Sequence, residues 1–129
     1  MFVTNLNPVQ QGALLKLAEM VAHADGQLWQ EQKTILETLR FQCSNPQTID
    51  SLDLPNLTSI FESRRDKVAL MLELIGVAYA NGDYHELEKG LIFEIAEALE
   101  LDSISIKDME NWVVRQLILV REANILMEG

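Results

Sequence analysis

Two short stretches of the sequence place oxygen-bearing side chains where a helical pattern breaks at a glycine. The first, AHADGQLWQEQ, holds Asp25 and, seven residues later, Gln32. The second, AYANGDYHELE, holds Asn81 and Glu88 at the same spacing, with Asp83 close by. Carboxylate and amide oxygens are the ligands that Ca²⁺ and Mg²⁺ take in proteins. If the two stretches face each other, these side chains could hold one divalent cation.

Local helix chemistry explains the same residues without a metal. An Asp or Asn at a helix end can close an Asx turn. A Glu in the first turn of a helix is favoured by the helix dipole. Neither stretch has the D-x-[DN]-x-[DN]-G spacing of an EF-hand loop. Both the cation site and the purely structural interpretation stay open from the sequence.

The other candidate sites have weaker support in the sequence. His85 and Glu88 lie one helical turn apart, but no second His completes an H-E-x-x-H motif. Glu73 and Glu94 lie in apolar helical stretches and could do acid–base chemistry, although such carboxylates more often pair with Lys or Arg or face a crevice. Cys43 fits a small apolar filler near a helix end. With no phosphate-binding loop, nucleophile elbow or zinc ligand set, the sequence favours a protein that is not an enzyme.

A repeat relates the two stretches. Setting Gly26 over Gly82, an offset of 56 residues, aligns both flanks without a gap. Both glycines suit the left-handed conformation that ends a helix, which makes each of them a structural elbow. The identical positions are Ala13, Leu14, Val21, Ala22, Ala24, Gly26 and Lys33 with Ala69, Leu70, Val77, Ala78, Ala80, Gly82 and Lys89.

The helices that position the elbows follow from apolar periodicity. One helix–elbow–helix repeat spans roughly 8–43 and the other 64–100. The helix at 64–80 is apolar nearly all round, which is typical of a central helix. Between the repeats, Asn45-Pro46 and Leu54-Pro55 each suit the start of a short helical turn. A last helix, 106–127, is opened by a sequence at Ser105 that resembles a capping box.

These elements predict an all-α fold in a single domain, 1–129. The expected architecture is a pseudo-symmetric helical bundle of about five main helices plus one or two short ones. No segment alternates as a strand would. We expect Trp112, Leu117 and Val120 of the last helix to lie in the core.

Composition limits the classes of partner. The chain has 129 residues and a formal net charge of −10, so it disfavours nucleic acid and suits cations or a basic partner. No apolar stretch reaches the roughly 18 residues that a membrane span needs, and the start of the sequence does not resemble a signal peptide. A lone cysteine suits a reducing cytoplasm, where we expect the protein.

The doubled elbow resembles the TerB family of bacterial tellurite-resistance proteins and its wider TerB-like group, including the N-terminal region of a DnaJ-like co-chaperone. The resemblance spans Leu14 to about Leu101. It implies an all-helical bundle and acidic elbow residues that bind a divalent cation. Asp25 and Glu88 match that acidic pattern, whereas Gln32 and Asn81 replace its Glu and Asp. A weakened or vestigial site for Ca²⁺ or Mg²⁺ is therefore implied.

Three hypotheses follow. The first is a non-enzymatic, stress-linked TerB-like binding module with a weak cation site at the elbows. The second is a protein–protein interaction or oligomerisation domain whose elbows are purely structural, with an unknown protein or a second copy as the partner. The third, an enzyme, has the least support.

Overall fold

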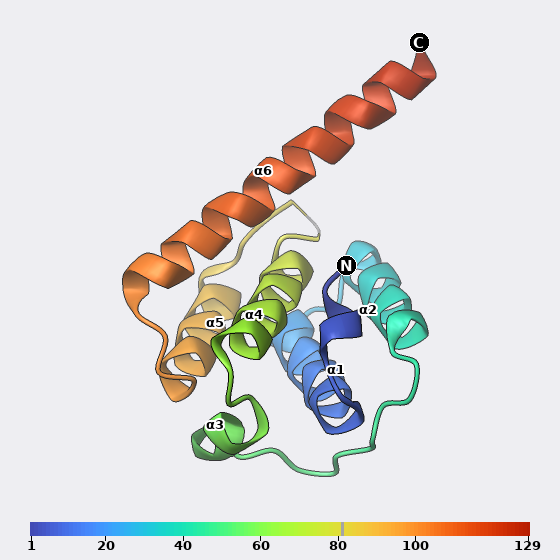
Figure 1. The fold of residues 1–129 in the computed structure, drawn as a ribbon. Helices are drawn as coiled ribbons and strands as arrows, with labels where there is room; N and C mark the ends of the chain where they lie inside the picture. The colour runs from blue at the N-terminus through green and yellow to red at the C-terminus, as the bar shows by residue number, and fades with distance from the viewer. Residues whose placement is uncertain (81) are drawn as a thin grey trace.

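The computed structural model describes residues 1–80 and 82–129, and over these residues the chain is helical (Figure 1). The long helices are α1 (Pro8–His23), α2 (Gln30–Gln42), α4 (Arg64–Ala78), α5 (Glu86–Ala98) and α6 (Ser103–Glu128). The short ones are η1 (Val3–Asn5), η2 (Leu54–Asn56) and α3 (Leu57–Ile60). No strand occurs among the residues described. The predicted all-α class and the five main helices are confirmed.

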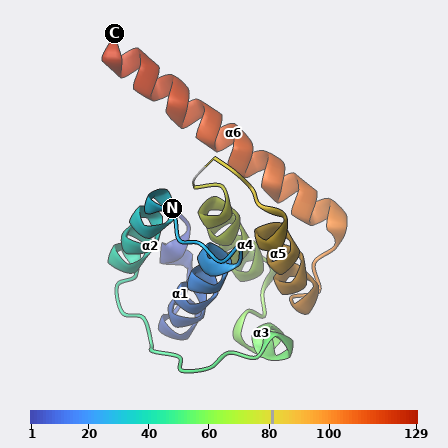
Figure 2. The ribbon, with the colours of Figure 1, turned by 180° about the vertical axis from the view of Figure 1, so that it is seen from behind.

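Helix α4 is the centre of the bundle. It packs against α1, α2, α5, α6 and η1. Its side chains Leu70, Leu74 and Ile75 are fully buried, and burying a side chain of this size contributes about 1.5–3 kcal/mol each. Figures 1 and 2 show α1 beside α4, with α2 and α5 on the outer sides. The predicted central position of this helix is confirmed.

Short polar side chains fix where the helices begin. Asn7 caps α1 by accepting the backbone N–H of Gln10 at 2.9 Å, just before Pro8. The start predicted for the last helix at Ser105 is wrong, because Asp102 caps α6. Its carboxylate accepts the N–H of Ser105 at 2.7 Å, which adds the first turn Ser103–Ser105 to the helix. An Asp is at least as strong an N-cap as a Ser.

The connector between α2 and η2 crosses α1 at Gly12. The backbone N–H of Gln47 donates to the carbonyl of Pro8 at 2.9 Å. A Cβ on Gly12 would lie 1.8 Å from the Gln47 carbonyl oxygen, so only glycine permits this approach. Figure 2 shows the connector running along the end of the bundle away from α6. The helical turn predicted at Asn45-Pro46 is wrong, because this segment is held as a strap by Gln47, whereas the turn at Leu54 is present.

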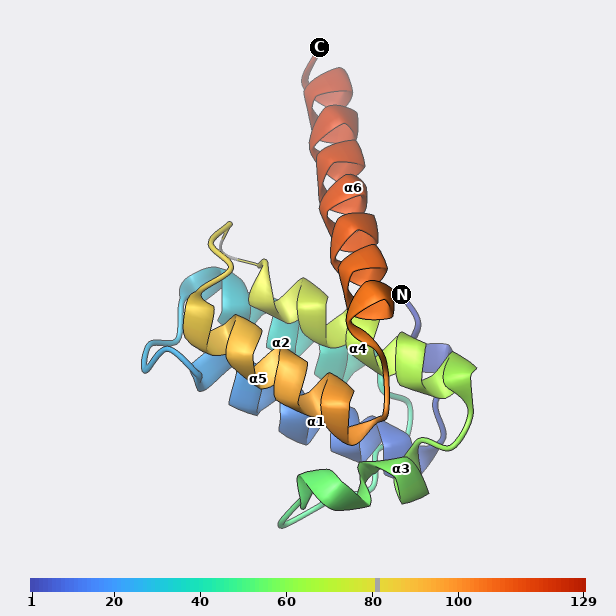
Figure 3. The ribbon, with the colours of Figure 1, turned by 90° about the vertical axis from the view of Figure 1, so that its left-hand side faces the viewer.

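Helix α6 lies partly on the bundle and partly beyond it. Ile106, Met109 and Val113 are buried against the body, and Figure 3 shows the rest of the helix projecting away. Leu117 is 38% exposed and Val120 51%. Their predicted place in the core is therefore wrong, because α6 runs past the end of α4 and α5. No helix among the described residues is long and apolar enough to span a membrane.

The single cysteine lies at the end of α2. Cys43 is buried, and its backbone N–H donates to the carbonyl of Leu39 at 3.0 Å. Burial, together with the nearby Glu73 carboxylate, raises the pKa of its thiol. The residue is thus a small apolar side chain of the core, as the sequence indicates, and a poor nucleophile.

Candidate functional site at the two elbows

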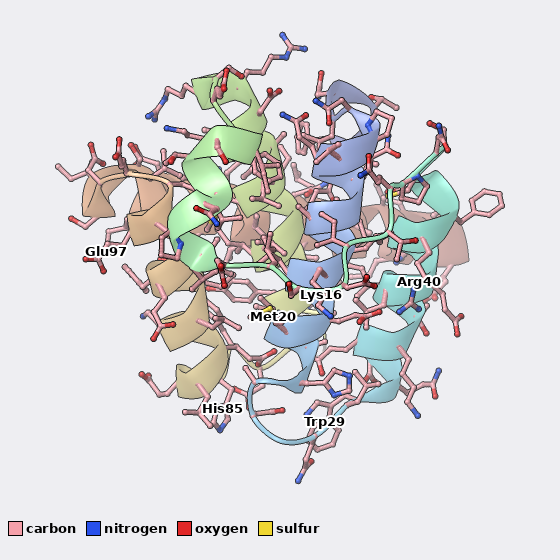
Figure 4. The ribbon with its side chains drawn as sticks, turned by 90° about the horizontal axis from the view of Figure 1, so that it is seen from below. Lys16, Met20, Trp29, Arg40, His85 and Glu97 are labelled. Carbon is pink, nitrogen blue, oxygen red and sulfur yellow. The ribbon has the colours of Figure 1, made fainter. Side chains whose placement is uncertain are left out.

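The two elbows lie at the same edge of the molecule. Figure 4 shows Trp29 and His85, the residues that precede α2 and α5, near each other at this edge. Both are N-cap residues with extended backbone. The first turns of α2 and α5, which begin directly after these two residues, therefore lie close together.

The backbone of the two elbows has the same form. Gly26 and Gly82 have φ of 83° and 81°, in the left-handed region that favours glycine. The N–H of Gly26 donates to His23 at 3.0 Å, and that of Gly82 to Tyr79 at 2.9 Å. Each glycine thus satisfies a carbonyl at the end of the preceding helix and turns the chain toward the next one.

A direct hydrogen bond joins the helices that follow the elbows. Gln32 Nε2 donates to Glu88 Oε2 at 2.6 Å, and both side chains are 0% exposed. Each side chain also closes the start of its own helix. Gln32 Oε1 accepts the N–H of Trp29, and Glu88 Oε1 accepts the N–H of His85, both at 3.3 Å. The pair therefore caps two helices and connects them at once.

The electrostatics of the pair are dominated by burial. Loss of solvent raises the pKa of Glu88, and the negative charge of Asp25 raises it further. The backbone N–H of His85 and the amide of Gln32 act in the opposite direction, because they stabilise the carboxylate. The pKa of Glu88 is therefore raised above its ordinary value, with burial as the largest cause.

Asp25 is placed differently. Its Oδ1 accepts the N–H of Gln27 at 3.0 Å, which is an Asx turn, and this bond lowers the pKa of the carboxyl. The indole Nε1 of Trp29 donates to Oδ2 at 3.4 Å and acts in the same direction. Asp25 stays at the surface, charged, close enough to Glu88 for its field to reach that group.

The predicted ligand set is only partly assembled among the described residues. Gln32 and Glu88 meet, with Asp25 nearby, whereas Asp83 lies exposed on the loop. Asn81 is outside the described residues. Within residues 1–80 and 82–129, no three His, Cys, Asp or Glu side chains are grouped as a metal site would require.

The remaining candidates have local roles. His85 Nδ1 accepts the N–H of Leu87 at 3.0 Å, so this imidazole caps α5. Glu73 Oε1 accepts the N–H of Phe2 at 2.7 Å and lies 3.1 Å from the amino group of Met1. Glu94 is exposed on α5. Glu73 thus holds the N-terminal segment on α4, whereas Glu94 faces solvent on α5.

A second polar pair was not anticipated from the sequence. The amide of Gln10 donates to Asp66 Oδ2 and to the carbonyl of Ile60, both at 3.0 Å. Its Oε1 accepts the N–H of Asn7 at 2.9 Å. Gln10 is buried although its sequence context is polar. The signal that could have found the pair is the repeat itself, since Gln10 and Asp66 are again 56 residues apart.

Aromatic residues flank the second elbow near α6. The rings of Tyr79 and Tyr84 lie 4.4 Å apart, and the Lys89 ammonium is 5.9 Å from the Tyr84 ring. Burial, with Glu110 of α6 beside it, raises the pKa of the Tyr84 phenol. In the described part of the chain, Tyr84 Oη and Glu110 Oε2 are buried without a hydrogen-bond partner. This contact attaches α6 to the elbow.

Comparison with known proteins gives one match. Residues 16–111 match the family model described as tellurite resistance protein TerB. No curated protein and no solved structure matches the chain. The matched range includes both elbows and the whole of α2, α4 and α5.

Proposed function

Because the chain belongs to the TerB family, we propose that it acts as a non-catalytic binding module for a protein partner. The observation that carries this proposal is the 2.6 Å hydrogen bond between Gln32 and Glu88. It uses the buried polar groups of both elbows to connect helices. In an enzyme such groups would face an open, concave site. Here their polar atoms are committed to the scaffold.

We infer that the scaffold is a pseudo-symmetric pair of repeats. Helices α1 and α4 begin 56 residues apart, as do α2 and α5. Helix α2 also contacts α4, and α5 contacts α1, as a twofold relation between the hairpins requires. Residues 56 apart that lie near such an axis must meet, and Gln32 with Glu88 and Gln10 with Asp66 do so. The repeats would form one domain over 1–129.

The acidic surface supports a partner that carries positive charge. Acidic side chains number 20 against 10 basic ones. Among described residues the ion pairs are Arg40 with Glu19 and the Met1 amino group with Glu73. The exposed carboxylates of α5, which include Glu94 and Glu97, take part in neither. Figure 4 shows Glu97 on the outer side of the bundle. Exposed Leu87 and Phe93 lie on the same helix, so this face offers both charge and apolar contact.

A capture experiment tests the binding module. Tagged protein would be used to capture partners from a lysate of the native host, in parallel with a Glu94→Lys/Glu97→Lys variant. The matched control is Glu31→Lys/Glu37→Lys, which changes charge equally on α2. We expect one partner to be lost from the α5 variant alone, and its binding to weaken as salt rises. Capture that both variants retain equally would contradict the proposal.

A weak divalent-cation site is the second candidate. It is favoured by the field of Asp25 at Glu88, because the negative charge of Asp25 raises the pKa of Glu88 and a cation held near both carboxylates would offset that repulsion. With Asp25 and Glu88 as its carboxylates, such a site has few charged ligands. Affinity for Ca²⁺ would be on the order of 10⁻⁴ to 10⁻³ M. Gln32, Asp83 and Asn81 would supply the remaining oxygens.

Calorimetric titration with Ca²⁺ and Mg²⁺ separates this site from purely structural elbows. Asp25→Asn should abolish binding. Gln32→Glu combined with Asn81→Asp restores the acidic pattern of the family and should tighten binding at least tenfold, because affinity follows ligand charge. If neither the wild type nor this double variant binds at several millimolar cation, the elbows are structural only.

In the cell, we propose that the protein has a role in stress or tellurite resistance. The family description names tellurite resistance. Growth of a host strain lacking the protein, measured across a tellurite series, tests it directly. Complementation by the wild type but not by the α5 variant would connect the phenotype to the binding surface.

A further inference from the structure

A pocket lies between α1, α2 and the strap that crosses α1 at Gly12. Its volume is about 360 Å³, and it shares no residue with the elbows or with the α5 surface. Sites for small molecules have volumes of roughly 300–1,000 Å³, and a cavity of about 150 Å³ already holds a benzene molecule. The pocket is therefore large enough for a ligand of on the order of ten non-hydrogen atoms.

The strap forms one wall of the pocket and is held in place by hydrogen bonds to α1. The backbone N–H of Gln47 donates to the carbonyl of Pro8 at 2.9 Å. The backbone N–H of Asn45 donates to Gln11 Oε1 at 3.2 Å, and Gly12 lets the strap lie directly on the helix. This wall is fixed before a ligand arrives, so binding needs little ordering of the chain.

Lys16 is the residue in the pocket that indicates an anionic ligand. Its side chain is partly buried on α1 and lines the pocket. Carboxylates outnumber cationic side chains by 20 to 10 in the chain. Even so, the two ion pairs found among residues 1–80 and 82–129 do not include Lys16. A carboxylate supplied by a ligand would neutralise this ammonium group.

Arg40 adds a second cation to the same pocket. Its Nη2 donates to Glu19 Oε1, and both side chains are about half exposed. A guanidinium has five N–H donors, so Arg40 can bind Glu19 and a ligand together. Two cations and one carboxylate give the wall a net positive charge, which suits a monoanion better than a dianion. Figure 4 shows Lys16 and Arg40 on the neighbouring helices α1 and α2, at the same face of the molecule.

The packing of the hairpin does not require these two charges. The positions 56 residues after Lys16 and Arg40 are occupied by Leu72 and Ala96. Ala96 is fully buried, and Leu72 packs against the core. The second helix pair thus forms with apolar residues at both positions, and the cations are a property of the first pair alone.

Apolar side chains complete the pocket. Leu15 of α1 and Ile49 of the strap both line it, and both are only partly covered by the rest of the core. Pro46 contributes a further apolar surface. A ligand with an aliphatic body would cover these groups, whereas a bare inorganic anion would leave them in contact with water.

We propose that this pocket binds a small monocarboxylate with an aliphatic body. Its carboxylate accepts hydrogen bonds from Lys16 and Arg40, and its body lies against Leu15 and Ile49. No bond is made or broken. The site goes beyond the binding of a protein partner, and it depends neither on the α5 surface nor on the elbow chemistry.

Titration with sodium hexanoate, followed by amide chemical shifts in nuclear magnetic resonance at constant ionic strength, tests the proposal. For a ligand of this size we expect a dissociation constant of a few millimolar, on the order of 10⁻³ M. The shifts should centre on Gly12, Lys16 and Thr48. Acetate should bind at least about tenfold more weakly, because each buried methylene contributes about fourfold. 1-Hexanol, which has the same body without the charge, should also bind at least about tenfold more weakly.

Three charge variants test the assigned residues. Lys16→Gln should weaken hexanoate at least about tenfold. Lys107→Gln is the matched control, since it changes charge equally at an exposed position of α6 and should leave binding unchanged. Glu19→Gln should tighten binding about threefold, because it removes a repulsive carboxylate and releases Arg40. The dispersion of the amide spectrum verifies that each variant is folded.

Several results would overturn the proposal. One is the absence of localised shifts at about 50 mM hexanoate, roughly ten times the expected dissociation constant. Another is equal binding by the wild type and Lys16→Gln. Acetate that binds as well as hexanoate would show that the apolar wall takes no part. Inorganic phosphate that binds more tightly than hexanoate would assign the pocket to an inorganic oxyanion instead.

Discussion

Gln10 and Asp66 lie 56 residues apart in the chain, yet Gln10 Nε2 and Asp66 Oδ2 are 3.0 Å apart. The pair stands at the beginning of α1 and of α4, just as Gln32 and Glu88 stand at the beginning of α2 and of α5. All four residues occupy the third position of their helix, where a side chain can also serve the N-cap. Helix starts and the contact between hairpins are therefore built from the same few groups.

The Gln10–Asp66 bond should appear as a coupling energy. In a double-mutant cycle of Gln10→Ala and Asp66→Ala, we expect the two costs in unfolding free energy to be non-additive by about 1 kcal/mol. Chemical denaturation of the four proteins measures it. The control cycle pairs Gln10→Ala with Glu122→Ala on the projecting half of α6, where the costs should add. Additivity in the first cycle would show that the bond contributes nothing.

Stability should depend on pH through Glu88. Burial raises its pKa in the folded state above 4.5, the ordinary value for a glutamate in the unfolded chain. The folded state therefore binds this proton more tightly than the unfolded state does, so stability from this group is present below pH 4.5 and is lost as pH rises through the folded pKa. Between the two pKa values the loss approaches about 1.4 kcal/mol per pH unit.

The variant Glu88→Gln removes that titration. The unfolding free energy of the wild type should fall relative to the variant as pH rises above 4.5, measured by urea denaturation at each pH. Glu97→Gln, on the exposed face of the same helix, serves as the control and should run parallel to the wild type. Parallel curves for wild type and Glu88→Gln would contradict the assignment.

The strap over α1 should make Gly12 intolerant of a methyl group. Gly12→Ala places a Cβ 1.8 Å from the Gln47 carbonyl oxygen, so the strap must move. We expect a loss of about 2 kcal/mol or more in unfolding free energy. Gly90→Ala in α5 is the matched control, because no atom lies within 4 Å of its added Cβ. That change should stabilise the protein by about 0.5–1 kcal/mol. Equal effects at both sites would disprove the close approach.

The elbow glycines should resist substitution for a different reason. No atom lies within 4 Å of a Cβ at Gly26, so space does not restrict it. The backbone φ of 83° restricts the position instead. Gly26→Ala should therefore lower the unfolding free energy by about 1 kcal/mol through backbone strain. Gly26→Asn should cost less, since Asn tolerates the left-handed region better. Thermal unfolding of the three proteins measures the order, and an Ala variant as stable as the wild type would exclude the strain.

The sequence predicts the helices well because their determinants are local. Apolar spacing and the Asn7-Pro8 signal place α1, and the offset of 56 residues carries the same limits to α4. Caps are harder, because neighbouring polar residues compete. Asp102 and Ser105 can each begin a helix, and only the path of the chain decides between them.

A local sequence pattern does not show which residues are buried by segments far away in the chain. Leu117 and Val120 continue the apolar spacing of α6, but the spacing does not say where the rest of the bundle ends. Similarly, Gln32 and Glu88 were both identified as elbow residues. Their hydrogen bond to each other depends on how the two hairpins pack, and the sequence of one segment alone does not predict that packing.

The buried Cys43 makes this protein convenient for labelling. Its thiol is the only one in the chain, is withdrawn from solvent, and has a raised pKa, so it reacts slowly with maleimides. A cysteine introduced anywhere on the surface would thus carry a fluorophore or spin label alone, in the native background. The distance between two introduced cysteines, for example one at an elbow and one near the end of α6, becomes measurable by resonance spectroscopy with two substitutions.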